Sequence, residues 1–152
     1  MGVSGSASST AALRWAAGQA RLRGAEIWAV HAWSPPGERL APYAPLRGVL
    51  SRERQRAASS ALLTAAIGHA SEAGVRPVLI EGEVVPVLLR YAAKAHLLVL
   101  GRRLRPGHLG GAALGAVARA CLASVQCPAV TVTAAEMIDD VPASPPCERH
   151  CA

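Results

Sequence analysis

The chain has 152 residues and a formal net charge of +6, and 51% of its residues are hydrophobic but only 3% aromatic. This length suffices for one domain whose core is built from Ala, Val, Leu and Ile. No apolar run approaches the roughly 20 residues of a membrane-spanning helix, and residues 1–6 lack the pattern of a signal peptide. These features predict a cytoplasmic protein without a membrane partner.

The positive charge does not by itself predict a nucleic-acid-binding protein. Arginines are scattered along the chain, Lys94 is the only lysine, and the abundance of Ala, Gly and Pro beside them is typical of a GC-rich genome. Local clusters occur only at Arg52/Arg54/Arg56 and at Arg102/Arg103/Arg105. Nucleic acid is therefore not an expected partner.

The four cysteines do not form the pattern of a disulfide framework or a metal site. Cys121 falls on the apolar face of a predicted helix and Cys127 at a helix-to-strand turn, and both are best interpreted as small buried hydrophobic residues. Cys147 and Cys151 flank His150, but zinc normally takes four ligands and no second pair stands at a suitable spacing. We expect no metal site, and the role of the two C-terminal cysteines stays open.

Hydrophobic periodicity predicts strands and helices in alternation. Gly2-Val3 are the last residues of a first strand, which is either this short or continued by residues ahead of Met1. Residues 4–9 form a turn rich in N-capping serines, and Gly24 is placed to end the helix that follows. The further predicted elements are a strand at 26–31, an irregular proline-rich segment at 34–48, a helix at 49–73, a strand at 77–81, a helix from Val84, a strand at 97–100, a helix at 112–125 and a strand at Ala129–Thr133.

Five strands separated by helices predict a three-layer α/β sandwich with a parallel sheet. Ligands of such folds bind at the carboxyl ends of the strands, where the strand order reverses. If the first and fourth strands flank that point, residues 4–6 and the loop after Gly101 line one crevice. The alternating strand Ala129–Thr133 is expected at an edge of the sheet. Residues 135–152 are acidic and proline-rich and are expected to form a disordered tail.

Three segments in this order resemble the universal stress protein family. They are Val3-Ser4-Gly5-Ser6 through Val30-His31-Ala32-Trp33, Glu81-Gly82 through Leu97-Leu98-Val99-Leu100-Gly101, and Leu114-Gly115-Ala116-Val117 through Cys127-Pro128-Ala129-Val130. The resemblance covers residues 1–134. It implies an adenine nucleotide alpha hydrolase-like fold with a five-stranded sheet of order 3-2-1-4-5, a regulatory role in the stress response, and ATP bound between strands 1 and 4 in one branch of the family. It also implies a homodimer, for which we expect the edge strand around Val130 and Val132 to form the interface.

The nucleotide-binding branch carries Gly-x2-Gly-x9-Gly-[Ser/Thr] after the fourth strand, and this chain matches that motif only in part. Gly101 matches the first glycine and Gly115 resembles the third, but Leu104 stands at the second and Ala116 replaces the hydroxyl residue. Ser4 replaces an acidic residue. The resemblance implies that a nucleotide would be bound by Ser4, Val30, Gly101, Gly115, Ala116 and Val117. Arg103 is a further candidate, because it adds positive charge to the loop and a guanidinium can bond two phosphate oxygens.

Two functional hypotheses remain open from the sequence. In the first, the protein binds ATP or a related nucleotide, with Mg²⁺ as the only metal, brought in by ATP. In the second, the altered glycine loop no longer binds nucleotide and the protein acts as a dimeric interaction module. No nucleophile–base pair or paired-carboxylate site is recognisable, so an enzyme is not predicted, weak ATP hydrolysis aside.

Overall fold

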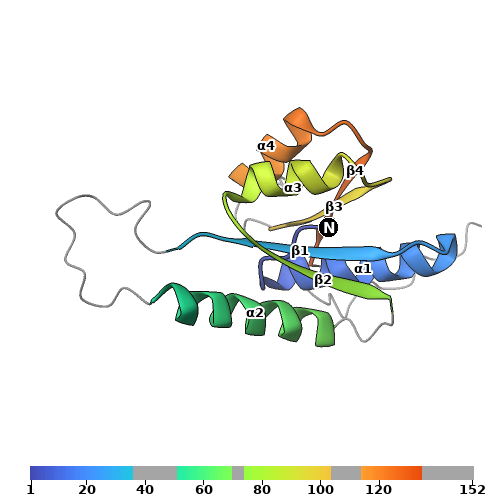
Figure 1. The fold of residues 1–152 in the computed structure, drawn as a ribbon. Helices are drawn as coiled ribbons and strands as arrows, with labels where there is room; N and C mark the ends of the chain where they lie inside the picture. Colours follow the sequence, from blue (N-terminus) through green and yellow to red (C-terminus); the bar gives the residue numbers. More distant parts are fainter. Residues whose placement is uncertain (36–50, 70–73, 104–113, 135–152) are drawn as a thin grey trace, which may run out of the picture.

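The computed structural model of the protein describes residues 1–35, 51–69, 74–103 and 114–134 (Figure 1). Helices and strands alternate along these segments, as the periodicity predicts. The elements are α1 (Ala7–Arg23), β1 (Ile27–Trp33), α2 (Arg52–Gly68), β2 (Val75–Glu81), α3 (Val84–Ala92), β3 (Leu98–Arg102), α4 (Ala116–Ser124) and β4 (Ala129–Thr133).

All the strands pair in parallel, but the described residues form no continuous five-stranded sheet. β1 pairs with β2 and β3 pairs with β4, which gives two sheets of two strands each. Residues 1–3 lie between these sheets, where Gly2 forms an isolated bridge with Val30 of β1. On one side Val3 N donates to Val30 O over 2.8 Å, and on the other Gly2 N donates to Val99 O over 3.1 Å. The short first segment therefore connects the two sheets.

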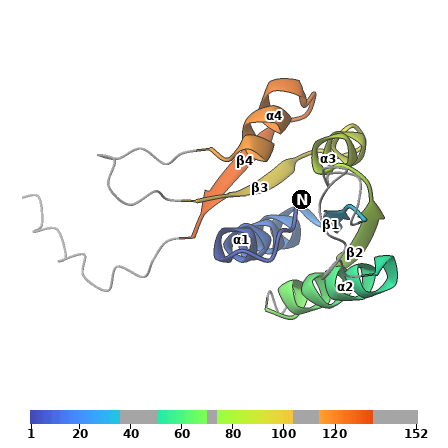
Figure 2. The same cartoon turned by 90° about the vertical axis from the view of Figure 1, so that its left-hand side faces the viewer.

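Two pairs of helices cover the two faces of the strands. Figure 2 shows α1 and α2 on one side, and α3 and α4 on the other. Two buried clusters lie on the first side. One consists of Val3, Leu13, Ala17, Ile27, Ala29, Leu63 and Ala66, and the other, between α1 and β3, of Ala12, Ala16 and Val99. Those on the second side are Val30, Val87, Leu88, Ala92, Leu98, Leu100, Ala118 and Cys121. Aliphatic and small side chains build both cores, as the composition predicts, and the three-layer α/β architecture follows.

Helix α1 begins and ends at the predicted capping residues. Ser6 is its N-cap, and the Ser6 side chain accepts a hydrogen bond from Ser9 N. Gly24 follows the last turn with φ of 61°, and its N–H donates to Ala20 O. The left-handed conformation of Gly24 lets its N–H bond a carbonyl of the last helix turn. Glycine adopts this conformation without the steric cost that a Cβ atom would add.

The structure corrects several predicted boundaries. The strands predicted at 26–31 and 97–100 are Ile27–Trp33 and Leu98–Arg102. The helix predicted at 49–73 begins only at Arg52, because Ser51 is its extended N-cap, and it ends at Gly68. The strand predicted at 77–81 begins at Val75, since Pro77 is tolerated in a strand that pairs on one side only. The helix predicted at 112–125 begins at Ala116, after the extended Gly115.

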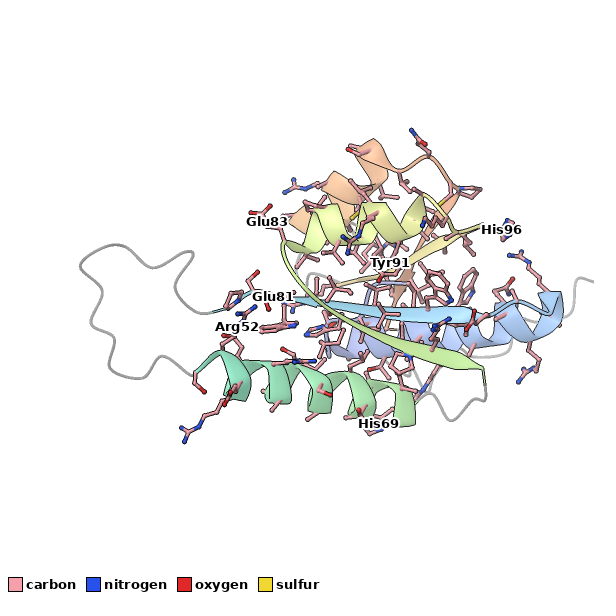
Figure 3. All side chains as sticks on the ribbon, in the orientation of Figure 1. Arg52, His69, Glu81, Glu83, Tyr91 and His96 are labelled. Carbon is pink, nitrogen blue, oxygen red and sulfur yellow. The ribbon has the colours of Figure 1, made fainter. Side chains whose placement is uncertain are left out.

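An ion pair joins α2 to the end of β2. Arg52 from the first turn of α2 and Glu81 from the last residue of β2 point toward one another (Figure 3), with Arg52 Nη2 at 2.7 Å from Glu81 Oε2. Both side chains are substantially exposed, so the pair is expected to contribute less than about 1 kcal/mol. This pairing gives one member of the first arginine cluster an ordinary structural role.

Several sequence expectations fall outside the described residues. They concern the irregular segment predicted at 34–48 from residue 36 onward, Leu104, Arg105, His150, Cys147, Cys151 and the tail at 135–152. Within the described parts, no helix is both long and apolar enough to cross a membrane. The same parts hold no group of three or more His, Cys, Asp or Glu side chains that could bind a metal ion.

Candidate functional site

A cavity of about 710 Å³ lies at the carboxyl ends of β1 and β3, beside the start of α1 and of α4. The seven residues expected from the sequence all line it, although they come from four separate parts of the chain. They are Ser4, Val30, Gly101, Arg103, Gly115, Ala116 and Val117. The fold therefore brings together every predicted site residue in one place.

A chain of serine hydroxyls forms the wall of the cavity where α1 begins. Ser4 Oγ lies 3.0 Å from Ser6 Oγ, which lies 3.1 Å from Ser8 Oγ. Ser4 N donates to Ser9 Oγ over 2.9 Å. Gly5 turns the chain with φ of 73°, a conformation that residues with a Cβ rarely adopt. The turn thus presents several hydroxyl groups, each able to donate or accept a hydrogen bond.

The end of β3 comes into close contact with the first turn of α1. A Cβ atom added at Gly101 would lie 2.6 Å from the backbone C and O atoms of Ser8 and 2.7 Å from Ser9 N. Only glycine allows this approach without displacing a backbone. Glycine at position 101 therefore allows the serine wall and the β3 end of the cavity to be in contact. This packing requires glycine here whether or not a ligand binds.

The cavity is also lined by the N-terminus of α4 and by two arginines, which make up its positive wall. Gly115 is the N-cap of α4 and has no side chain to bond the first N–H groups. Unsatisfied N–H groups give a helix N-terminus partial positive charge. Arg103 and Arg119 line the same cavity, and no aspartate or glutamate is among its described lining residues. The electrostatics of the cavity therefore favour an anion.

Among the polar residues that line the cavity, Ser8 and Arg119 were not singled out from the sequence. Arg119 lies three positions after Ala116, so the helical repeat places it on the same side of α4, one turn further along. His31 also lines the cavity, and its Nδ1 lies 2.8 Å from Val3 O. This bond holds the ring against the first segment, which gives His31 a structural role.

Comparisons with known proteins agree with the fold. A sequence model described as the universal stress protein family matches residues 1–133. A crystal structure of a universal stress protein in complex with cAMP is similar, with a TM-score of 0.62 and 23% identity over 88% of this chain and 94% of that one. A family protein from Burkholderia pseudomallei gives a TM-score of 0.61 and 22% identity over 86% and 91%. An Arabidopsis thaliana family protein with AMP bound gives a TM-score of 0.53 and 20% identity over 84% and 79%.

Proposed function

Because the chain belongs to the universal stress protein family, we propose that it is a stress-response regulatory protein that binds ATP or a related adenine nucleotide. The binding site is the cavity at the carboxyl ends of β1 and β3. The observation that carries this proposal is the convergence of the α4 N-terminus, Arg103 and Arg119 on a cavity without an acidic side chain among its described residues. Relatives of the same fold were crystallised with cAMP and with AMP.

The phosphate groups would lie against the positive wall of this cavity. The N–H groups at the start of α4 supply hydrogen-bond donors, and a guanidinium can bond two phosphate oxygens at once. The adenine ring would pack on the apolar side, where Val30, Ala32 and Leu114 line the cavity. Mg²⁺ would enter with a polyphosphate chain rather than bind the protein alone, because Mg²⁺ prefers carboxylate and phosphate oxygens.

Titration of the purified protein with ATP, AMP and cAMP tests this function. We expect Arg103→Ala to weaken binding by about tenfold, the loss of roughly one charge-assisted hydrogen bond. Arg90→Ala removes the same charge from a residue that does not line the cavity and serves as the matched control. Ala116→Ser restores a hydroxyl at the start of α4 and should strengthen binding. Absence of binding by the unmodified protein at millimolar nucleotide would contradict the proposal.

The proposal includes the organisation that the sequence indicates. Residues 1–134 form the domain, and its five strands have the order 3-2-1-4-5. In this order residues 1–3 are strand 1, and β1, β2, β3 and β4 are strands 2, 3, 4 and 5. The hydrogen bonds of these residues to Val30 and Val99 support that order.

The protein is a cytoplasmic homodimer through β4, which pairs on one side only among the described residues. A monomer at high micromolar concentration in analytical ultracentrifugation would contradict the dimer.

A further inference from the structure

The charges of this chain are divided unevenly between the domain and the residues that follow it. Residues 1–134 contain fifteen basic and six acidic residues, a net charge of +9, whereas residues 135–152 contain one basic and four acidic residues, a net charge of −3. The only two aspartates of the chain, Asp139 and Asp140, follow Glu136 closely. We call residues 136–140 the acidic segment. It lies beyond Ala134, the last described residue.

The acidic segment leaves the sheet at the edge where the candidate nucleotide cavity lies. β4 ends at Thr133, which is the register partner of Arg102 at the end of β3. Arg103, the next residue, lines the cavity. Neighbouring strands lie about 4.8 Å apart and consecutive Cα atoms about 3.8 Å, so Thr133 and Arg103 are within roughly 10 Å. Glu136 and Asp139 follow Thr133 by three and six residues, and extended chains of those lengths span roughly 10 and 20 Å. The segment is therefore long enough to reach the cavity.

Arg102 carries a polar group without a partner at the same point. Its Nε is the one buried side-chain nitrogen or oxygen that lacks a hydrogen bond among the described residues. A buried donor of a charged group is costly to leave unsatisfied. Side chains alternate between the faces of a strand, so Arg102 shares its face with Leu100, which lines the cavity. A carboxylate suits this donor, because a guanidinium can bond both carboxylate oxygens.

The positive wall of the cavity offers further donors to a carboxylate. Arg103, Arg119 and the N-terminus of α4 belong to this wall, and the described lining holds no aspartate or glutamate. Carboxylate and phosphate oxygens accept hydrogen bonds from the same groups, the guanidinium and the N–H groups of a helix N-terminus. The acidic segment and a nucleotide phosphate would therefore compete for this wall.

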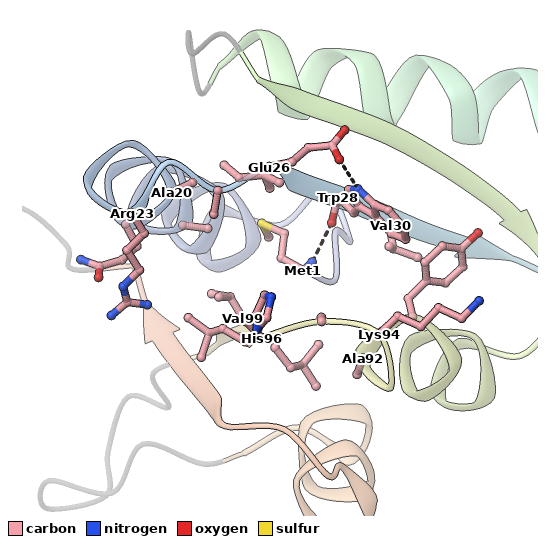
Figure 4. A pocket seen from close by; sticks show the side chains of 18 of the residues that line it. Met1, Ala20, Arg23, Glu26, Trp28, Val30, Ala92, Lys94, His96 and Val99 are labelled. Carbon is pink, nitrogen blue, oxygen red and sulfur yellow. Dashed lines mark hydrogen bonds between the residues drawn. The ribbon is translucent and has the colours of Figure 1, made fainter.

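A second cavity, of about 510 Å³, offers the acidic segment no comparable place (Figure 4). It lies at the opposite ends of the strands, beside the start of β3, and the five residues of β3 separate it from Arg102 by roughly 15 Å. Its charged lining is also mixed, since Glu26 stands with Arg23 and Lys94. Position and charge therefore both favour the cavity at the carboxyl ends.

We propose that the acidic segment folds back onto the positive wall of the candidate nucleotide cavity and pairs with Arg102, as an internal competitor of nucleotide phosphate. The effect on nucleotide affinity rests on the proposed function, whereas the docking itself requires no nucleotide. A short tether gives the segment an effective concentration in the millimolar range. A docked state that exceeds the undocked state about ninefold raises the apparent Kd for nucleotide about tenfold. Salt weakens the docking, because the pairing is electrostatic.

Neutralisation of the acidic segment in the full chain tests the effect on nucleotide. The test variant replaces its three carboxylates by amides of similar shape, in Glu136→Gln/Asp139→Asn/Asp140→Asn. The matched control removes three charges outside the segment and outside the described cavity lining, in Glu26→Gln/Glu53→Gln/Glu148→Gln. In titrations with AMP at low salt, we expect the test variant to bind about tenfold more tightly than the unmodified protein and the control to stay within about twofold. The difference should shrink in 0.5 M NaCl.

The Nε–H signal of Arg102 in proton–nitrogen NMR spectra reports the docking without nucleotide. A carboxylate partner holds this proton in a charge-assisted hydrogen bond and slows its exchange with water. We expect the test variant to shift this signal and to speed its exchange about tenfold relative to the unmodified protein. The control should leave both the position of the signal and its exchange unchanged.

Two results would overturn the proposal. In one, the test variant and the control change the affinity for AMP equally, which would show an effect of net charge alone. In the other, the Arg102 signal is the same in the unmodified protein and the test variant, which would show that the segment does not dock. If none of the three proteins binds nucleotide, the proposed function fails, and the Arg102 signal still decides whether the segment docks.

Discussion

Replacement of Gly101 by alanine tests the contact that joins the two halves of the candidate site. The added Cβ would lie 2.6 Å from backbone atoms of Ser8, whereas ordinary contact begins at 3.4 Å, so β3 and α1 must separate by about 0.8 Å. Overpacking of this kind costs typically 1–3 kcal/mol. Because the obstacle is helix backbone and not a flexible side chain, we expect a loss of unfolding free energy of about 2–3 kcal/mol.

Urea denaturation followed by circular dichroism measures this loss. The control is the same change at Gly18, in the middle of α1, where an added Cβ meets nothing within 4 Å. Gly18→Ala should raise the unfolding free energy by about 0.5–1 kcal/mol, because alanine is the better helix former. If Gly101→Ala stays within 0.5 kcal/mol of the unmodified protein (roughly the effect of an ordinary surface change), the close approach of β3 to α1 is wrong.

Three further predictions follow from other parts of the structure. Burial lowers the pKa of the Met1 ammonium from 8.0 to about 6, so between those pH values the unfolded chain binds more protons. Stability should therefore rise from pH 6 to pH 8, by up to roughly 2–3 kcal/mol, and N-terminal acetylation should abolish that rise in thermal melts. Cys121 is fully buried, and burial raises the pKa of its thiol. Mass spectrometry after iodoacetamide treatment should therefore find Cys121 unmodified until the protein unfolds, and rapid modification of Cys121 in the folded protein would contradict its buried position. Arg52→Ala should cost less than about 1 kcal/mol in urea denaturation, because the Arg52–Glu81 pair is exposed, and a larger loss would mean that Arg52 does more than this pairing.

The sequence predicts the elements of this fold better than their boundaries. Serine and glycine caps define both ends of α1 because capping depends on local chemistry. The start of β2 at Val75 depends instead on pairing with Ile27 of β1, which no local pattern reveals. The predicted start of α4 at residue 112 is too early for a different reason. Ala112, Ala113 and Leu114 fit a helical pattern as well as a loop, so the sequence does not show that the helix begins only at Ala116.

The candidate site could be predicted to the extent that its residues follow strands. The carboxyl ends of parallel strands meet at one edge of the sheet, which brings Ser4 and Gly101 together. Val30 lies within β1 and was a candidate only through the family resemblance. Arg119 was missed because it lies in the second turn of α4, and strand topology says nothing about helix faces. The close contact of Gly101 with Ser8 was also missed, since it depends on the exact separation of a strand and a helix.

The placement of residues 1–3 between two small sheets has a consequence for the order of folding. Two-stranded sheets are marginal by themselves, and here the bonds of Gly2 and Val3 to Val99 and Val30 connect them. Gly2 and Val99 are separated by most of the chain, and contacts of such long range form slowly. We expect β1–β2 and β3–β4 to assemble first as separate units, with the three N-terminal residues closing the molecule last.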